Sequence, residues 1–102
     1  MSATIPNRAG YKVHAAIVKA LAHPTRLFIV DELSRGERPV GDLTELIGVE
    51  MATVSRHLSV LKNAGILADE KRGSLVFYRI RLPCVLNVFH CLKEIEAERH
   101  KR

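Results

Sequence analysis

Two short amphipathic segments follow one another in the middle of the chain, with only a few residues between them. In the first, apolar residues recur at helical spacing over residues 39–48. In the second, Val54, Leu58 and Leu61 share one helical face, and a turn signal follows at residues 63–65. Two short helices joined by a glycine-containing turn are typical of the helix-turn-helix motif. This pattern restricts the possible folds more than any other feature of the sequence.

The apolar spacing changes from helical to strand-like after Gly65. Residues 66–72 and 75–81 are separated by Gly73 and Ser74, and the second run is rich in β-branched and aromatic residues. These runs predict a two-stranded hairpin with a basic tip. A hairpin placed directly after a helix-turn-helix gives a winged helix-turn-helix fold, which is mainly α with a two-stranded β wing.

Three further segments have the spacing of amphipathic helices. The first runs from Tyr11 to about Ala22, the second from Pro24 to Gly36, and the last from Pro83 to about residue 100. The stripes expected to be buried are Val13, Ala16, Ile17, Ala20 and Leu21 in the first helix, and Leu27, Phe28, Val30 and Leu33 in the second.

Length and composition fit one small domain. At 102 residues with 47% hydrophobic residues, the chain can fold, but it buries only about two thirds of its surface, so a partner subunit would help it. We expect residues 1–10 to form a flexible arm and residues 11–102 to form the domain. No run reaches the roughly 18–20 apolar residues of a membrane span, and the N-terminus lacks a secretory pattern. With only two cysteines, the chain fits a cytoplasmic, reducing compartment.

Basic residues are concentrated in the second half of the chain. Residues 1–50 carry six basic and six acidic side chains, whereas residues 51–102 carry ten basic and five acidic ones. Such a basic half suits a polyanion, and a solvated surface with a chance imbalance is the alternative. An enzyme is disfavoured, because no glycine-rich phosphate loop and no Ser/His/Asp or Cys/His set is recognisable.

The last helix carries two adjacent apolar stripes, which together are wider than one small domain needs to cover. The first stripe is Leu82, Val85, Leu86, Phe89 and Leu92, and the second is Cys84, Val88, Cys91 and Ile95. We expect one stripe to pack on the core and the other to pair with a second copy, with Val88, Cys91 and Ile95 in the dimer interface. The alternative is that both stripes are internal core.

Three stretches, residues 21–27, 54–67 and 73–80, in this order and spacing, resemble the ArsR/SmtB family of bacterial metal-sensing repressors. The match runs over about residues 11–100. The resemblance implies a homodimeric winged helix-turn-helix repressor that dimerises through its terminal helices. It also implies binding to double-stranded DNA at an inverted-repeat operator and release by an effector.

In such a fold the second helix of the motif lies in the major groove. The candidate DNA-binding residues on this helix are Thr53, Ser55, Arg56, His57 and Lys62. Arg56 can contact guanine in a bidentate manner or a phosphate. The alternatives are a helix-surface hydroxyl for Ser55 and a packed helix histidine for His57.

The start of this helix departs from the family pattern. Small polar residues or glutamine are usual there, and this chain has Glu50, Met51 and Ala52. Glu50 is a weaker N-cap than serine or aspartate, and Met51 and Ala52 offer apolar contacts instead of hydrogen bonds. The resemblance alone therefore leaves the base-specific contacts undefined.

The hairpin tip is the second candidate DNA contact. Its candidate residues are Lys71, Arg72 and Ser74, because basic hairpin tips reach a flanking minor groove or phosphates. A solvated turn is the alternative. Arg26 has two candidate roles, either pinning the start of the second helix to a neighbour or contacting the DNA backbone.

The resemblance implies effector ligands on the third or the last helix. The third helix has no cysteine, so Cys84 and Cys91 on the last helix are the candidate effector residues. They share a helix face but lie about 10 Å apart along the axis, so one ion cannot bridge both within one chain. Across an antiparallel dimer, Cys84 of one copy could approach Cys91 of the other. The candidate ligand is trivalent arsenic or another thiophilic metal ion, and no cofactor is certain. A redox-active disulfide, and structural cysteines in a constitutive DNA-binding protein, remain open alternatives.

Overall fold

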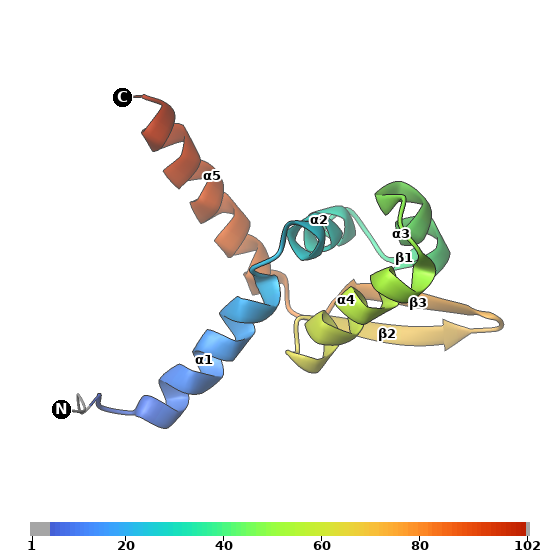
Figure 1. Ribbon diagram of the computed structural model, residues 1–102, viewed down its shortest axis with the longest axis horizontal. Coiled ribbons are helices and arrows are strands. Elements are labelled where there is room, and N and C mark those ends of the chain that lie inside the picture. The colour runs from blue at the N-terminus through green and yellow to red at the C-terminus, as the bar shows by residue number, and fades with distance from the viewer. Residues whose placement is uncertain (1–4, 102) are drawn as a thin grey trace.

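Residues 5–101 are described by a computed structural model, shown in Figure 1. The elements follow the chain as helices at both ends around a helix-turn-helix and a small sheet. They are α1 (Arg8–Leu21), α2 (Pro24–Leu33), β1 (Arg38–Pro39), α3 (Val40–Ile47), α4 (Met51–Asn63), β2 (Leu67–Arg72), β3 (Leu75–Ile80), the 3-10 turn η1 (Pro83–Val85) and α5 (Leu86–His100). The winged helix-turn-helix prediction is confirmed by this order.

The hydrophobic core lies between α2, α3, α4 and the base of the hairpin. Val54, Leu58 and Leu61 are fully buried, so the inner face of α4 is the one that the helical spacing predicted. The other core residues are Ala20, Leu21, Ile29, Val30, Leu33, Leu43, Ile66 and Leu67. Three large apolar side chains anchor α4, and burying each of them contributes about 1.5–3 kcal/mol.

The wing differs from the predicted two-stranded hairpin because a third strand joins it. The strand order is β1-β3-β2, all antiparallel, with Arg38 opposite Tyr78 and Leu67 opposite Ile80. Pro39 was expected to open the third helix, but it is the second residue of β1, and α3 starts one residue later. Proline is tolerated in such an edge strand, because its missing N–H faces no partner strand.

Helices α1 and α2 differ in detail from the helices that the sequence predicts. Helix α1 begins at Arg8, after Asn7 in a left-handed conformation, so residues 8–10 are helical and do not belong to an arm. Residues 1–4 lie outside the described part of the chain. In α2 the buried residues include Ile29, and Phe28 is 39% exposed, because the face that meets α4 is rotated from the predicted one.

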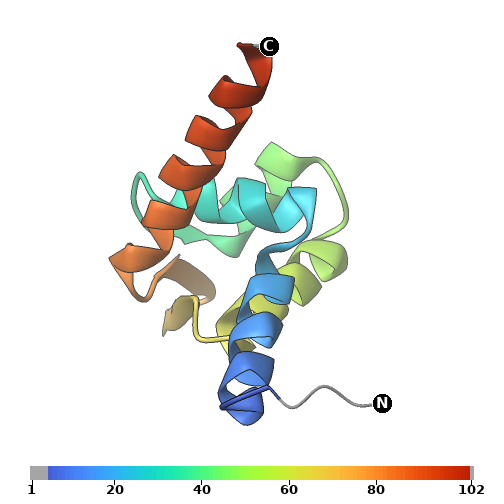
Figure 2. The same cartoon turned by 90° about the vertical axis from the view of Figure 1, so that its left-hand side faces the viewer.

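Helices α1 and α5 project away from the core on the same side of the molecule (Figures 1 and 2). The radius of gyration is 16.0 Å, against about 13 Å for a compact domain of this length. Only Ala20 and Leu21 of α1 are buried, and α5 has no buried residue among those described. The predicted buried stripe of α1 is therefore largely exposed within a single chain.

Apolar side chains cover both projecting helices. Among them, Tyr11, Val13 and Val18 of α1 are about 60% exposed, and Val88, Leu92 and Ile95 of α5 are about 40–50% exposed. By length and hydropathy, no single helix among the described residues could cross a membrane. Only when α1 and α2 are taken together are they long and apolar enough for a membrane span, and this pair is bent by 86°.

Candidate nucleic-acid interface

The outward face of α4 carries polar and basic side chains. Arg56, Ser59 and Asn63 are exposed and lie at positions i, i+3 and i+7 on one helical face, opposite the buried leucines. Thr53 flanks this face and is half-buried. Sequence analysis missed Ser59 and Asn63, although their spacing from Arg56 would have indicated them.

The N-terminus of α4 is exposed and has no side-chain cap. Glu50 is at the N-cap position and makes no capping hydrogen bond with its side chain, while its carbonyl accepts from the amides of Thr53 and Val54. Met51 is 51% exposed beside it. The free amides and the positive end of the helix dipole at this point favour a phosphate group.

Two other predicted residues on α4 are less accessible than Arg56, one by partial burial and one by an ion pair. Ser55 is half-buried, and the Lys62 ammonium lies 3.0 Å from an Asp69 carboxylate oxygen on β2. This exposed ion pair joins the end of α4 to the hairpin. Lys62 therefore helps to place the wing beside α4, while about half of its side chain stays open to solvent.

His57 packs against α2. Its ring lies 4.5 Å from the ring of His23, and its Nδ1 accepts a hydrogen bond of 3.1 Å from Nε of Arg26. Burial is the largest cause that lowers the pKa of His57, followed by His23, Arg26 and Arg56. The contacts are those of a packed helix histidine, which was the alternative role. Arg26 accordingly pins the second helix to a neighbour, the first of its two candidate roles.

Arg72 at the end of β2 is held by two carboxylates. Its guanidinium donates to both Glu37 oxygens, at 2.6 and 2.9 Å, and to Glu70 at 2.9 Å, and it stacks over the Phe77 ring at 4.5 Å. The Arg72 hydrogen bonds lower the pKa of Glu37 and of Glu70, and those carboxylates raise the pKa of Arg72. Lys71 is exposed beside it.

The local sequence does not reveal the Arg72 contacts, because Glu37 lies 35 residues away. The result is a wing in which Arg72 is already neutralised, while Lys71 and Ser74 at the hairpin tip and Arg79 on β3 are exposed. A tip of this kind can contribute to phosphate binding through Lys71 without the Arg72 charge.

Replacing Glu37 by alanine should free Arg72 from one of its two carboxylates, leaving only Glu70, and strengthen DNA binding. We expect a gain of about twofold to fivefold in affinity and a salt dependence steeper by about 0.9 for one additional phosphate contact. Fluorescence anisotropy at several salt concentrations measures both. The matched control is Glu45→Ala, which removes the same charge from an exposed site on α3. Equal effects of the two variants would show that only net charge matters.

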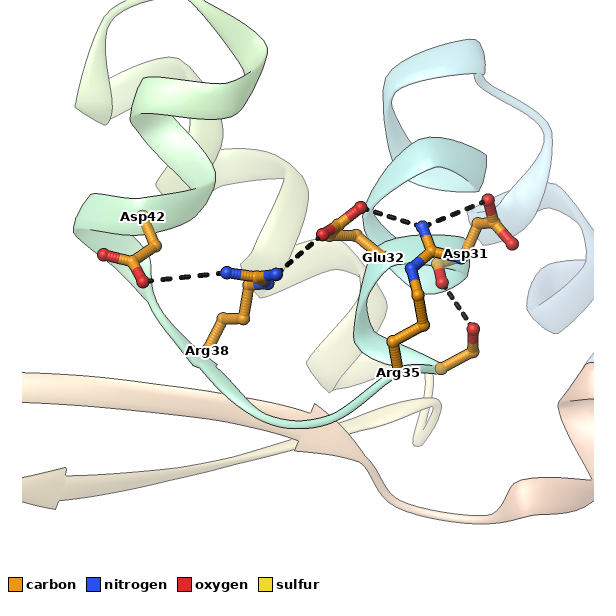
Figure 3. Close-up of polar contacts among 6 residues, drawn as sticks. Asp31, Glu32, Arg35, Arg38 and Asp42 are labelled. Carbon is orange, nitrogen blue, oxygen red and sulfur yellow. Dashed lines mark hydrogen bonds and ion pairs between the residues drawn. The ribbon is translucent and has the colours of Figure 1, made fainter.

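A second ion-pair cluster fixes the first half of the helix-turn-helix, as Figure 3 shows. The Glu32 carboxylate contacts Arg35 at 2.9 Å and Arg38 at 3.0 Å, and Arg38 reaches Asp42 on α3 at 3.9 Å. The hydrogen bond from Arg35 is the largest cause that lowers the pKa of Glu32. The cluster joins the end of α2 to β1 and the start of α3.

The predicted effector and dimer residues lie on the projecting side of the molecule. Cys84 and Cys91 are both exposed free thiols. Cys84 lines an apolar groove of about 430 Å³ between α1 and the start of α5, with Ile17, Val18 and Val88 among its other walls. Within the described residues of one chain, no group of three His, Cys, Asp or Glu side chains could hold a metal ion.

Known proteins share this sequence and fold. The model for bacterial regulatory proteins of the arsR family matches residues 23–69. The regulator NmtR of Mycobacterium tuberculosis is 39% identical over 79 residues, which are 78% of this chain and 65% of that protein. The biofilm growth-associated repressor of Xylella fastidiosa is 35% identical over 89 residues, covering 81% of this chain and 78% of that protein. The part of this chain that matches NmtR covers slightly less than two thirds of the length of that regulator.

Solved structures agree on the architecture. The homodimeric winged helix-turn-helix DNA-binding domain of Mb0332 from Mycobacterium bovis superposes with a TM-score of 0.82 at 29% identity, covering 99% of this chain and 94% of that one. The fold is that of a winged helix-turn-helix regulator. The chain belongs to the arsR family of bacterial regulatory proteins, which confirms the resemblance found in the sequence.

Proposed function

We propose that the chain is a homodimeric transcriptional repressor that binds an inverted-repeat operator in double-stranded DNA and leaves it when an effector binds. The observation that carries this proposal is the exposed face of α4, with Arg56, Ser59 and Asn63 projecting from a helix whose other face is fully buried. A rigidly backed helix with outward polar groups is suited to the major groove. The repressor name of the Xylella relative supports the same role.

The proposed dimer uses the projecting helices. Val88 and Ile95 of α5 and Val18 of α1 are 41–64% exposed, and Val18 and Val88 line the same apolar groove, which suits a surface that binds a partner. Pairing with a second copy through Val88, Cys91 and Ile95 would cover this surface and place two α4 helices on successive half-sites about 34 Å apart. The homodimeric Mb0332 domain supports this arrangement.

DNA binding is tested with the reduced protein and a fluorescent duplex taken from upstream of its own gene. We expect anisotropy to rise with protein concentration, and affinity to fall with salt by about 0.9 log units per log unit for each phosphate contacted. A shuffled duplex of the same composition is the control. Equal affinity for both duplexes would remove sequence-specific recognition from the proposal.

Cys84 and Cys91 are the proposed effector site, with trivalent arsenic or another thiophilic metal ion as the ligand. Both thiols are exposed on the surface assigned to the dimer, and a site with more ligands than one chain offers would draw on both copies. A redox disulfide between these cysteines is the second candidate, favoured by the same exposure. Constitutive binding with structural cysteines is the third.

Replacing both cysteines by serine should abolish effector release and leave DNA binding intact. A trivalent arsenical is expected to weaken operator binding of the wild type by about 100-fold, equivalent to a coupling near 3 kcal/mol. The double variant should not respond. Asn87→Ser, an exposed change on the same helix, is the matched control and should respond like the wild type. Release by an oxidant alone would favour the disulfide, and no release by either reagent would favour constitutive binding.

A further inference from the structure

Arg26 connects three helices at one point. Its Nε donates to Nδ1 of His57 on α4 at 3.1 Å, and its Nη1 donates to the backbone carbonyl of Ala20 on α1 at 3.3 Å. Arg26 itself lies in the first turn of α2, beside the N-cap residue His23. One guanidinium therefore joins a projecting helix, α1, to the helix that carries the proposed DNA-binding face, α4.

This junction requires a neutral His57. Because Nδ1 accepts a hydrogen bond from Arg26, it must carry a lone pair. The proton of the neutral ring therefore lies on Nε2. Adding a second proton would remove the acceptor and bring two positive charges together at hydrogen-bond distance. The junction would then break at its contact with α4, while the buried leucines would keep the helix attached to the core.

The surroundings of His57 are unfavourable to a positive charge. His23 and Arg26 face it from α2, and Arg56 faces it from its own helix. Helix α1 contributes the Ala20 carbonyl through Arg26. Helix α3 and strand β2 also pack against α4, and within residues 5–101 neither contributes a charged group that shifts the pKa of His57.

We propose that Arg26 is a positioning residue which, through neutral His57, holds α4 in its DNA-binding orientation relative to α1, and that protonation of His57 releases this hold and weakens DNA binding. The inference rests on the proposed DNA-binding function. Its sign distinguishes it from simple charge attraction, because added protons on a DNA-binding protein otherwise strengthen its attraction to phosphates.

The pH dependence follows from the lowered pKa of His57. Because the folded chain holds this pKa below the ordinary value of about 6.5, the contribution of the junction is complete above that pH. It is lost as the pH falls from about 6.5 through the lower folded value. We expect operator affinity to fall about fivefold or more as the pH drops from 7.5 to below the folded pKa of His57, the lower end of usual coupling between sites.

The test compares operator binding across this pH range in wild type, His57→Asn and His90→Asn. Asparagine at position 57 keeps an acceptor near the Nδ1 position, does not titrate, and has a helix propensity similar to histidine. His57→Asn should lose no affinity as the pH falls over the same range, whatever its affinity at pH 7.5. His90 is exposed on α5, so His90→Asn should follow the wild type. A wild-type complex that stays unchanged or tightens below the His57 pKa measured by NMR, or the same acid loss in His57→Asn, would overturn the proposal.

A measurement without DNA separates this inference from the proposed function. Histidine NMR titration of the free protein should give His57 a pKa below 6.5, and Arg26→Gln should raise that pKa because it removes a neighbouring positive charge. Arg26→Lys keeps the positive charge but lacks the Nε donor, so it tests the hydrogen bond to Nδ1 alone and should raise the pKa of His57 less. If no operator binding is found, the proposed function fails by itself. If the pKa of His57 is the same in both Arg26 variants as in the wild type, the proposed junction is excluded.

Discussion

Replacing Ile95 by glutamate is expected to separate the two copies of the proposed dimer and to weaken operator binding by about 100-fold or more. Ile95 is 52% exposed in the single chain and lies on the α5 face assigned to the partner. A carboxylate placed in an apolar interface would lose its hydration without gaining a partner. Separated copies would also lose the advantage of two linked half-sites, which is worth about 10²–10⁴ in affinity.

Analytical ultracentrifugation and anisotropy, at the same protein concentrations, measure the two effects of Ile95→Glu together. Ala97→Glu is the matched control, because it adds the same charge two residues further along α5, on the opposite side of the helix. The control should remain a dimer and bind the operator normally. A dimer that persists in Ile95→Glu would place the interface elsewhere, and a monomer that binds as tightly as wild type would remove the need for two copies.

Replacing Arg56 by alanine should cost about 1–3 kcal/mol of operator binding, the usual value of one good arginine contact to a base. Arg56 is the exposed cation at the centre of the outward face of α4, between Ala52 and Ser59. Arg56→Lys separates two kinds of contact. Lysine retains a phosphate contact but lacks the planar fork that binds guanine O6 and N7.

If Arg56 contacts a base, the lysine variant will discriminate less between the operator and single-base variants of it. If Arg56 contacts a phosphate, both duplexes will be weakened alike in the alanine variant, and lysine will restore most of the affinity. Lys93→Ala on α5 removes one exposed positive charge far from α4 and is the control for net charge. An Arg56→Ala variant no weaker than this control would exclude Arg56 from the interface.

The sequence predicted well what local spacing determines. Val54, Leu58 and Leu61 are all on the buried face, and the hairpin register turns at Gly73, whose φ of +62° suits glycine. Family resemblance and basic charge located the candidate site on α4 and the wing. These features depend on neighbours along the chain, so periodicity and turn residues suffice to find them.

Contacts between segments that lie far apart in the chain could not be predicted from the sequence. Three such contacts join residues at least 31 positions apart in the chain. They are the strand pairing of Pro39 with Phe77 and the hydrogen bonds of Arg72 to Glu37 and of Arg26 to His57. For α1, spacing predicted the helix correctly but not its exposure. Val13 is apolar and remains 59% exposed, because α1 projects from the core and only its last two residues are buried there.

Helix α5 is attached to the body of the molecule near one end only. Val85 and Phe89 pack against the core, and every residue from His90 to His100 is exposed. The free part extends about 16 Å beyond Phe89 at 1.5 Å per residue, so a tilt of about 10° displaces its far end by about 3 Å. The helix can therefore tilt with Phe89 as its pivot. Any change of packing at this pivot is therefore largest at the far end of α5, where every side chain from His90 to His100 is exposed.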